Sequence, residues 1–480
     1  MSFKPIFFIL GVLMTVLAAT MLLPFLIDLA THNSDWKAFA ASIGITAFTG
    51  ISLILTTRSP KLSINTKQAF LLTTLSWVVI AAFGAIPFCL SDLKMSYTDA
   101  FFESMSGITT TGSTVITGLD TTPPGILFWR AMLQWLGGVG ILIMALSVLP
   151  MLRVGGMQLF KAESLEVEKV MPSAAQIATN IGIIYCILTL IWAVLYALAG
   201  MTVFEAFSHS MTTIATGGFS TSDQSMRYFN SAVIDYICVS GMIVGGLPFV
   251  YYLRSLRGDP GVILRDSQVR WFLVILSIAI LITTSHLLLT QEIAVADAFR
   301  HASFNITSII TGTGYATQDY NAWGPLIMSL VFFLMCVGGC AGSTTCGIKI
   351  FRFQVLYAVS KTQMQKLLNP NGVFQPYYNG KPMSPEIPTS VMAFFFLFAL
   401  CFSVIALLLQ FIGLDFVTAM SGAVTAISNV GPALGDIIGP TGTFQPLPDS
   451  AKWVLAFGML IGRLEIFTLL IILSPQFWRD

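Results

Sequence analysis

Long apolar segments alternate with short polar stretches along the whole chain. Ten of these segments hold about 20 residues or more, the length that a helix needs to cross a hydrocarbon core of about 30 Å. We predict membrane spans at 5–29, 38–56, 69–90, 124–149, 176–200, 232–252, 271–290, 323–350, 389–411 and 451–474. The pattern therefore predicts an all-α polytopic membrane protein in a lipid bilayer.

Composition agrees with this prediction. Of 480 residues, 55% are hydrophobic and 10% are charged, whereas about a quarter of the residues in soluble domains are charged. The seven cysteines fall in hydrophobic segments without zinc-finger or CxxC spacing, and we interpret them as packing residues. The first apolar segment is too long for a signal-peptide core and precedes further spans, so we count it as a membrane helix. Nothing in the sequence favours a nucleic-acid partner.

Four shorter segments lie between the later spans and resemble one another. They are DAFFESMSGITTTGST (99–114), EAFSHSMTTIATGGFST (205–221), DAFRHASFNITSIITGTGYAT (297–317) and DFVTAMSGAVTAISNVGPALG (415–435). Each begins with an acid, which we expect to cap a short helix, and each leads to a glycine. A 12-residue helix is about 18 Å long and cannot span the membrane, so each segment must enter and return.

Irregular backbone at membrane depth is tolerated only where it is buried in protein or lines a wet cavity. We therefore predict four parallel helix–pore-loop–helix repeats around one central pore, plus two extra N-terminal transmembrane helices. The expected divisions are 1–68 for the N-terminal helices and 69–152, 153–258, 259–355 and 356–480 for the four repeats.

The turn after each short helix is the candidate site for a cation. The C-terminal end of a helix carries partial negative charge, and glycine allows successive carbonyls to face one axis and replace a hydration shell. The candidate filter residues are Thr110, Thr111, Gly112, Ala215, Thr216, Gly217, Gly218, Gly312, Thr313, Gly314, Asn429, Val430 and Gly431. One such turn alone would suggest close helix packing; four equivalent copies favour a pore.

Basic residues distribute unequally between the two ends of the predicted spans. Of 24 Lys and Arg, 17 fall on one side, five on the other, and Arg130 and Arg463 lie within spans. The positive-inside rule then places both termini in the cytoplasm and the four turns at the outer side. The basic stretches Arg254–Arg270 and Lys349–Lys366 would form a cytoplasmic surface that suits an acidic or nucleotide-bearing partner.

The segment 323–350 is too long for a straight span. Its 28 residues would extend about 42 Å as a helix, and its middle, CVGGCAGSTTCG (336–347), favours a loop. The expected gate residues are Gly338, Gly339, Gly342, Ser343, Thr344, Thr345 and the intramembrane Arg463. Arg463 would donate to the loop; a purely structural ion pair is the alternative. Glu465 is expected to contact a neighbouring span.

The four repeats, the four turns and the NVGPALG of the last copy resemble the Trk/Ktr/HKT superfamily of potassium transporters. The two extra N-terminal spans and the length resemble its bacterial TrkH branch. The resemblance implies a membrane homodimer, a cytoplasmic nucleotide-binding (RCK-type) regulatory subunit and a gating loop in the third repeat. It also implies potassium preference from glycine in all four turns. The Thr-Gly-Thr-Gly of the third turn departs from the pattern.

The sequence thus predicts potassium-selective uptake across the bacterial inner membrane, with K+ as transported ion and no covalently bound cofactor. A sodium or mixed-cation pathway of the same architecture is the first alternative. A membrane enzyme is disfavoured because no paired acids, HExxH or Ser/His/Asp set lies at membrane depth. An alternating-access carrier usually has inverted repeats, whereas these are parallel. Passive and proton-coupled transport both stay open.

Overall fold

The computed structural model describes residues 3–58, 64–147, 174–464 and 466–479. Within these ranges the chain is helical apart from loops and one antiparallel pair of short strands, β1 (Tyr377–Tyr378) and β2 (Lys381–Pro382). Glu465, which is expected to contact a neighbouring span, lies outside the described residues. The all-α membrane architecture predicted from the sequence is confirmed.

The first two spans form a separate hairpin. It consists of α1 (Lys4–Thr20), its continuation α2 (Leu22–Ala30), and α3 (Trp36–Thr57). A side chain on Gly11 would lie 2.7 Å from the carbonyl oxygen of Gly50, so α1 and α3 touch backbone to backbone. Small residues permit such close packing between helices in a membrane.

Four repeats follow, each with an entry helix, a short pore helix and an exit helix. Repeat 1 contains α4 (Thr66–Gly84), α5 (Ile86–Leu90), α6 (Tyr97–Ile108) and α7 (Pro124–Ser147). Repeat 2 contains α10 (Ala174–Leu198), α11 (Val203–Ile214) and α12 (Ala232–Gly245). Repeat 3 contains α15 (Ser267–Thr290), α16 (Val295–Thr311) and α17 (Pro325–Cys336). Repeat 4 contains α19 (Glu386–Ile412), α20 (Phe416–Ser428) and α21 (Asp449–Arg463).

The remaining elements connect or follow these repeats. The helices are α13 (Phe249–Leu256), α14 (Val262–Arg265), α18 (Ile350–Leu368), α22 (Phe467–Leu473) and α23 (Pro475–Arg479), and the 3-10 turns are Leu119–Thr121, Ser225–Phe229 and Tyr320–Trp323. Among the described residues, seven helices or helix pairs are long and apolar enough to cross a membrane as one span.

Three predicted spans are not straight helices. The predicted break in 323–350 is confirmed, because α17 ends at Cys336 and α18 starts only at Ile350. The spans predicted at 232–252 and 451–474 are each a bent pair of helices that can count as one broken span. The first bends by 92° between α12 and α13, and the second by 115° between α21 and α22. In the first, Pro248 stands at the N-cap of α13 and has no amide hydrogen with which to continue α12.

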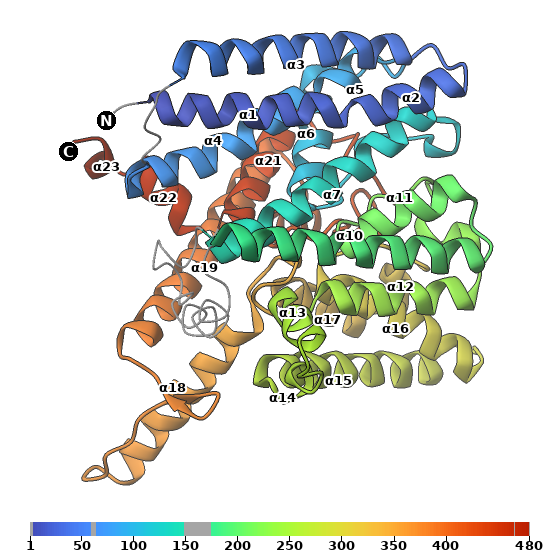
Figure 1. The fold of residues 1–480 in the computed structure, drawn as a ribbon. Coiled ribbons are helices and arrows are strands. Elements are labelled where there is room, and N and C mark those ends of the chain that lie inside the picture. The colour runs from blue at the N-terminus through green and yellow to red at the C-terminus, as the bar shows by residue number, and fades with distance from the viewer. Residues whose placement is uncertain (1–2, 59–63, 148–173, 465, 480) are drawn as a thin grey trace.

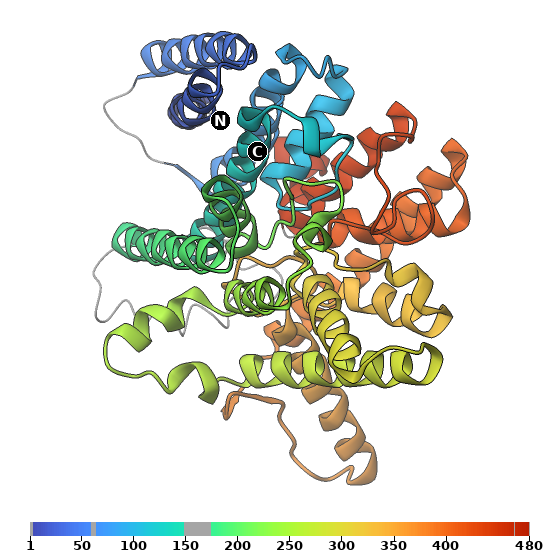
Figure 2. The ribbon, with the colours of Figure 1, turned by 90° about the vertical axis from the view of Figure 1, so that its right-hand side faces the viewer.

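The repeats surround one centre. Figure 2 looks along the axis that runs through this centre. It shows the repeats in chain order, from blue through green and yellow to red, with the N-terminal hairpin outside the ring. Figure 1 shows both termini at the same end of the molecule and α18 projecting beyond that end. The pore helices are almost wholly buried: in α6, every residue from Ala100 to Ile108 is inaccessible to solvent or nearly so. The turns that follow these helices therefore meet in the interior of the protein.

Candidate cation pathway

Local hydrogen bonds hold the N-terminal ends of the pore helices. Ser96 accepts from the amide of Asp99 in α6, and Thr202 forms a full capping box with Glu205 in α11. Asp415 caps α20 through the amide of Thr418. The side-chain and backbone hydrogen bonds from Thr418 lower the pKa of Asp415 below its usual value. The expected capping by an acid is thus found at α11 and α20, whereas α16, which contains Asp297, has no side-chain cap.

The inner end of each pore helix turns through a left-handed residue. At the end of α6 the amide of Thr110 donates to Gly107 O at 2.9 Å and the amide of Thr111 to Ser106 O at 2.8 Å. This pair of bonds is a Schellman cap, in which the residue after the cap adopts positive φ. The same pair closes α11 and α20, whereas only the first of the two bonds is found at α16. A common local motif thus produces the four turns.

The left-handed positions are equivalent in all four repeats. They are Thr110 (φ 53°), Thr216 (φ 50°), Gly312 (φ 74°) and Asn429 (φ 51°). The unusual Thr-Gly-Thr-Gly of the third turn therefore supplies a glycine where the backbone is left-handed in every repeat. The departure that the sequence raised leaves this backbone geometry unchanged.

The four glycines two positions later pack against one another in a closed ring. These glycines are Gly112, Gly218, Gly314 and Gly431. A Cβ atom on the first two would overlap Gly217 O and Thr313 O, respectively. A Cβ atom on Gly314 would lie 2.9 Å from Gly431 N, and one on Gly431 would lie 3.1 Å from Thr111 O. Each glycine thus touches the turn of the next repeat, and the fourth touches the first.

Side chains also close the seam between the last repeat and the first. Ser113 donates to Gly431 O at 2.8 Å, and the side-chain amide of Asn429 donates to the hydroxyl of Thr111 at 2.9 Å. Beyond the turns, the amide of Phe444 donates to Thr114 O at 2.9 Å. Residues more than 300 positions apart in sequence are therefore hydrogen-bonded at the centre.

A hollow of about 300 Å³ lies directly outside the ring and is lined by all four ring glycines. Of the thirteen candidate filter residues, these four glycines alone belong to the lining of the hollow. Ala215 is the C-cap of α11 and packs against Gly138 of α7. The side chain of Val430 joins a hydrophobic cluster with helices of repeat 3. The ring itself therefore consists of backbone and uncharged side chains.

The broken segment of repeat 3 lies against the inner side of the ring. The hydroxyl of Thr344 donates to Ile214 O at 3.1 Å and to Gly245 O at 3.0 Å, and Thr216 donates to that hydroxyl at 3.2 Å. The segment also pairs with itself, because Gly338 N–H donates to Ile348 O at 2.9 Å. It thus connects the turn of the second repeat to the break that follows α12.

Arg463 ends α21 and is 1% exposed. Its guanidinium donates to Thr344 O at 3.5 Å and to the sulfur of Cys346, so the predicted contact with the loop is present. It also donates to Gly137 O at 2.7 Å and lies 5.3 Å from the ring centre of Trp77. One side chain therefore joins repeat 4, the loop of repeat 3 and α7 of repeat 1.

The sequence model of one family, described as a cation transport protein and named TrkH, matches residues 36–479. The chain belongs to the TrkH family. It is 45% identical to the Trk system potassium uptake protein TrkI of Halomonas elongata over 479 residues, which is 99% of this chain and 97% of that one. It is 36% identical to the Trk system potassium uptake protein TrkH of Escherichia coli over the full length of both.

A solved structure agrees over the whole chain. The crystal structure of the potassium transporter TrkH from Vibrio parahaemolyticus superposes with a TM-score of 0.92 at 37% identity and covers 100% of both chains. The members of this family are ion transporters rather than enzymes.

Sequence reasoning missed several polar residues of this TrkH-family chain. Lys349 was counted only as a base on the inner surface, but it is buried and donates to the carbonyl and hydroxyl oxygens of Thr345. Arg352 is likewise buried, with its guanidinium 3.7 Å from the ring centre of Phe394. With Arg463 they line a cavity of about 30 Å³ beside the loop. The only available signal was their position next to a glycine-rich break.

Proposed function

We propose that the chain is a potassium-selective uptake pathway in the bacterial inner membrane and that the four-turn ring is its selectivity filter. The observation that carries the proposal is the closed ring, in which every glycine packs against the next turn. Relatives that carry the name potassium uptake protein support the choice of ion. The residues proposed to bind K+ are Thr110, Thr111, Gly112, Ala215, Thr216, Gly217, Gly218, Gly312, Thr313, Gly314, Asn429, Val430 and Gly431.

Selection in this proposal comes from dipoles rather than from charges. The ring holds no ionised side chain, so carbonyl and hydroxyl oxygens must replace the water around a cation. Such a site binds a monovalent ion firmly enough for entry and weakly enough for release. Because the glycines touch across the seams, contraction of the ring around the smaller Na+ would force backbone atoms to overlap.

The loop between α17 and α18 is the proposed gate. It lies beneath the second filter turn and donates to carbonyls at the break after α12. Arg463 holds this arrangement through Thr344 O and Cys346. The gate residues are Gly338, Gly339, Gly342, Ser343, Thr344, Thr345 and Arg463. Movement of this loop would open the path without altering the filter.

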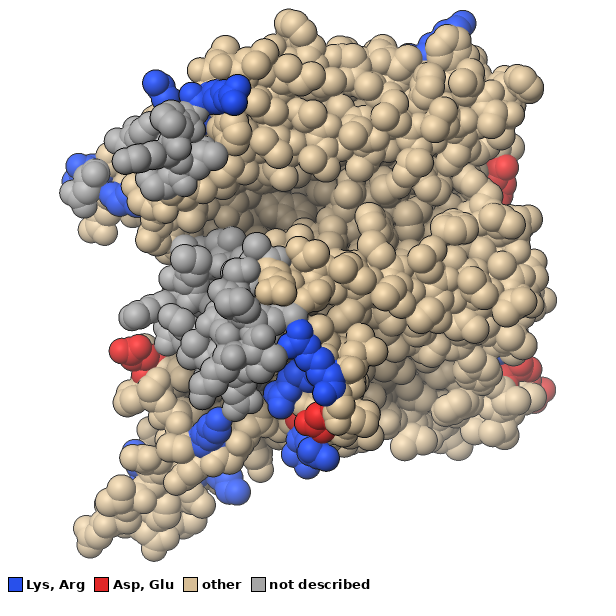
Figure 3. Space-filling model, in the orientation of Figure 1, with Lys and Arg blue, Asp and Glu red and all other residues tan. Residues whose placement is uncertain are grey.

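Orientation and partners extend the proposal. Both termini lie at one end of the molecule (Figure 1), and most Lys and Arg visible in Figure 3 gather on that side, so we place that end in the cytoplasm. The projecting α18 has exposed Leu367 and Leu368 at its tip, 82% and 79% accessible, which supports a homodimer. A separate RCK-type nucleotide-binding subunit would dock at this end. We keep the repeat divisions at 69–152, 153–258, 259–355 and 356–480.

Isotope flux tests this proposal directly. Purified protein in liposomes should take up K+ and Rb+ faster than Na+ down matched gradients. Comparable Na+ flux would replace the proposal with the sodium or mixed-cation alternative, and absence of flux for all three ions, even with the partner subunit added, would reject the pathway. Repeating the K+ measurement with and without an imposed pH gradient separates passive from proton-coupled transport.

A further inference from the structure

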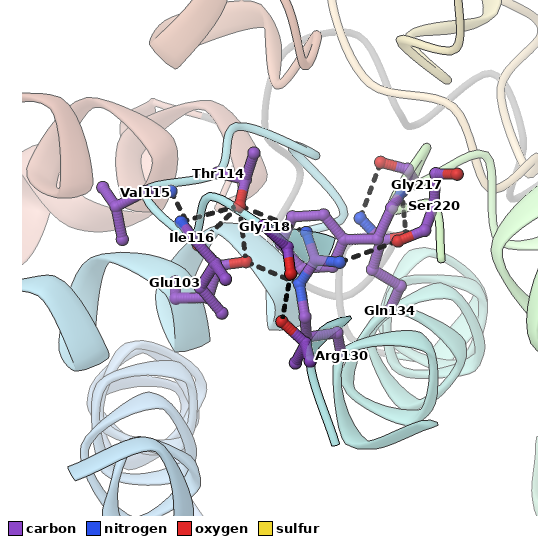
Figure 4. A network of polar contacts seen from close by, with 11 residues as sticks. Glu103, Thr114, Val115, Ile116, Gly118, Arg130, Gln134, Gly217 and Ser220 are labelled. Carbon is purple, nitrogen blue, oxygen red and sulfur yellow. Dashed lines mark hydrogen bonds and ion pairs between the residues drawn. The ribbon is translucent and has the colours of Figure 1, made fainter. Parts of the chain in front are cut away.

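A buried ion pair lies behind the outer end of the ring. Arg130 of α7 donates to Glu103 of α6 at 2.8 Å, and the two side chains are 1% and 0% exposed (Figure 4). Burial of two charges costs free energy that their mutual attraction alone often does not offset. Charged residues at membrane depth generally have a functional reason, and the other contacts of this pair supply one.

Arg130 holds the chain just beyond two filter turns. One terminal nitrogen donates to Ser220 O at 2.8 Å, and the other donates to the hydroxyl of Thr114 at 3.2 Å. Thr114 and Ser220 each follow a ring glycine, Gly112 or Gly218, by two residues. The guanidinium also lies 4.1 Å from the ring centre of Phe219. A single side chain thus connects repeat 1 to repeat 2 at the same level of the pore.

Glu103 holds Arg130 in place and has no capacity left for a cation. One carboxylate oxygen accepts from Arg130 and from the hydroxyl of Thr114 at 3.0 Å. The other accepts from the same hydroxyl at 3.1 Å and from the amide of Val115 at 2.9 Å. A carboxylate beside a cation filter is a candidate ion ligand, but all the contacts described for Glu103 are with groups of the protein.

Gln134 repeats the arrangement one turn further along α7. Its side-chain amide nitrogen donates to Gly217 O at 2.6 Å, and its oxygen accepts from the amide of Phe219 at 3.0 Å (Figure 4). Together, Arg130 and Gln134 contact Gly217, Phe219 and Ser220, the residues on both sides of the ring glycine Gly218. The helix α7 therefore fixes the second turn as well as its own.

We propose that Arg130, oriented by Glu103, is a positioning residue that sets the spacing of the first and second filter turns and thereby the ion selectivity of the pathway. The inference rests on the proposed function of the ring. It depends on the planar fork of arginine, which donates in three directions at once. Lysine keeps the charge and can satisfy Glu103, but its single nitrogen cannot also reach Ser220 O and Thr114.

The test compares Arg130→Lys with a matched pair elsewhere. Arg300 and Asp235 form an ion pair of 2.6 Å that joins α16 to α12, and the contacts described for it include no filter turn. In liposomes, Arg130→Lys should lower the ratio of K+ to Na+ flux on the order of tenfold, as expected for loss of a buried charged hydrogen bond. Arg300→Lys should leave the ratio within about twofold, because its contacts are remote from the ring.

Thr114→Val is a second test variant, for use if Arg130→Lys lowers the yield of folded protein. It removes the hydroxyl that contacts both Glu103 and Arg130 and leaves the charges unchanged. It should lower the ratio about threefold, less than Arg130→Lys. The proposal is overturned if folded Arg130→Lys or Thr114→Val protein keeps the wild-type ratio, or if Arg300→Lys changes the ratio equally. A wild-type protein without K+ preference would instead reject the proposed function, so the two failures are distinguishable.

Discussion

Threonine and asparagine occupy backbone conformations in this ring that proteins usually leave to glycine. Thr110, Thr216 and Asn429 all have φ near 50°, which costs about 1–2 kcal/mol for a residue with a Cβ atom. The Schellman bonds and the surrounding packing hold them there. The ring glycines also differ among themselves. Gly112, Gly218 and Gly314 have φ above 80°, whereas Gly431, which precedes Pro432, is not among the residues with positive φ.

This difference predicts graded effects of substitution. Gly112→Ser and Gly314→Ser should each reduce the ratio of K+ to Na+ flux by about tenfold. The backbone has positive φ at both positions, which is unfavourable for serine, and the new side chain would crowd the neighbouring turn. Gly431→Ser should have a smaller effect, because its Cβ would lie 3.1 Å from the nearest backbone atom. Flux ratios of folded variants, selected by thermal unfolding, check the order. Unchanged ratios for the first two variants would contradict the filter assignment.

For the individual residues, the sequence predicted which of them form the ring but not which contacts hold the ring in place. The recurring glycines indicated the ring, because four copies of one local pattern are visible without a structure. The supports were not visible. Ser113 and Gly431 are 318 residues apart, and no periodic pattern predicts such a contact. Arg130 was noted only as a charge inside a span, since its partners come from two different repeats.

Among the elements, the exit helices show how backbone groups left unpaired at one helix break find hydrogen-bond partners at another. The helix α7 runs through without interruption, while α12, α17 and α21 stop part-way. The amide of Thr344 donates to Gly245 O and that of Cys340 to Gly246 O, both at 3.1 Å. The carbonyls freed at the end of α12 therefore receive hydrogen bonds from the gate loop, as membrane depth requires.

Only the break after α17, in repeat 3, was predicted from the sequence. Its glycines are dense enough to exclude a helix, and its segment is too long for one span. The Gly245–Pro248 stretch and the end of α21 carry weaker signals, because single glycines are common inside membrane helices. Their breaks depend on partners in the loop of another repeat, which local sequence does not specify.

Substitution of Arg463 tests the proposed gate. Arg463→Ala removes the donor to Thr344 O and Gly137 O, which should destabilise the closed loop by about 1–3 kcal/mol. Basal K+ flux should then rise about tenfold and depend less on the regulatory subunit, with the K+ to Na+ ratio unchanged. Shortening the loop at Gly338–Thr345 should act in the same direction.

The matched control for the gate is Gly112→Ser, which should change the ratio and leave regulation intact. If loop deletion instead abolished flux in folded protein, or changed the ratio as strongly as Gly112→Ser, the loop would belong to the support of the filter. Filter and gate would then not be separable.

For the whole molecule, the charge asymmetry predicted from the sequence agrees with the surface in Figure 3, but the predicted docking surface needs a correction. Lys349 and Arg352 are buried beside the gate loop and are not available to a partner. The accessible bases in the described part of this end include Arg257 between α13 and α14 and Lys361 and Lys366 on α18. The partner surface that we propose therefore lies on α18 and on the link between α13 and α14.

Charge reversal tests that surface. The combined variant Arg257→Glu, Lys361→Glu and Lys366→Glu should weaken binding of an acidic or nucleotide-bearing subunit at least tenfold at low salt, because the attraction is electrostatic and screened by salt. Basal flux should persist. Reversal of Lys37 and Lys94, which are exposed at the opposite end, is the control and should leave binding unchanged. Normal binding by the triple variant would exclude this surface.

The seam between the fourth turn and the first has a consequence for biosynthesis. Gly431, Asn429 and Phe444 all bond to residues of the first repeat, so the ring is incomplete until the last quarter of the chain has left the ribosome. A nascent chain with three repeats inserted has three of the four pore helices but no closed ring. A translation product that stops before Asn429 therefore lacks the hydrogen bonds that join the fourth turn to the first.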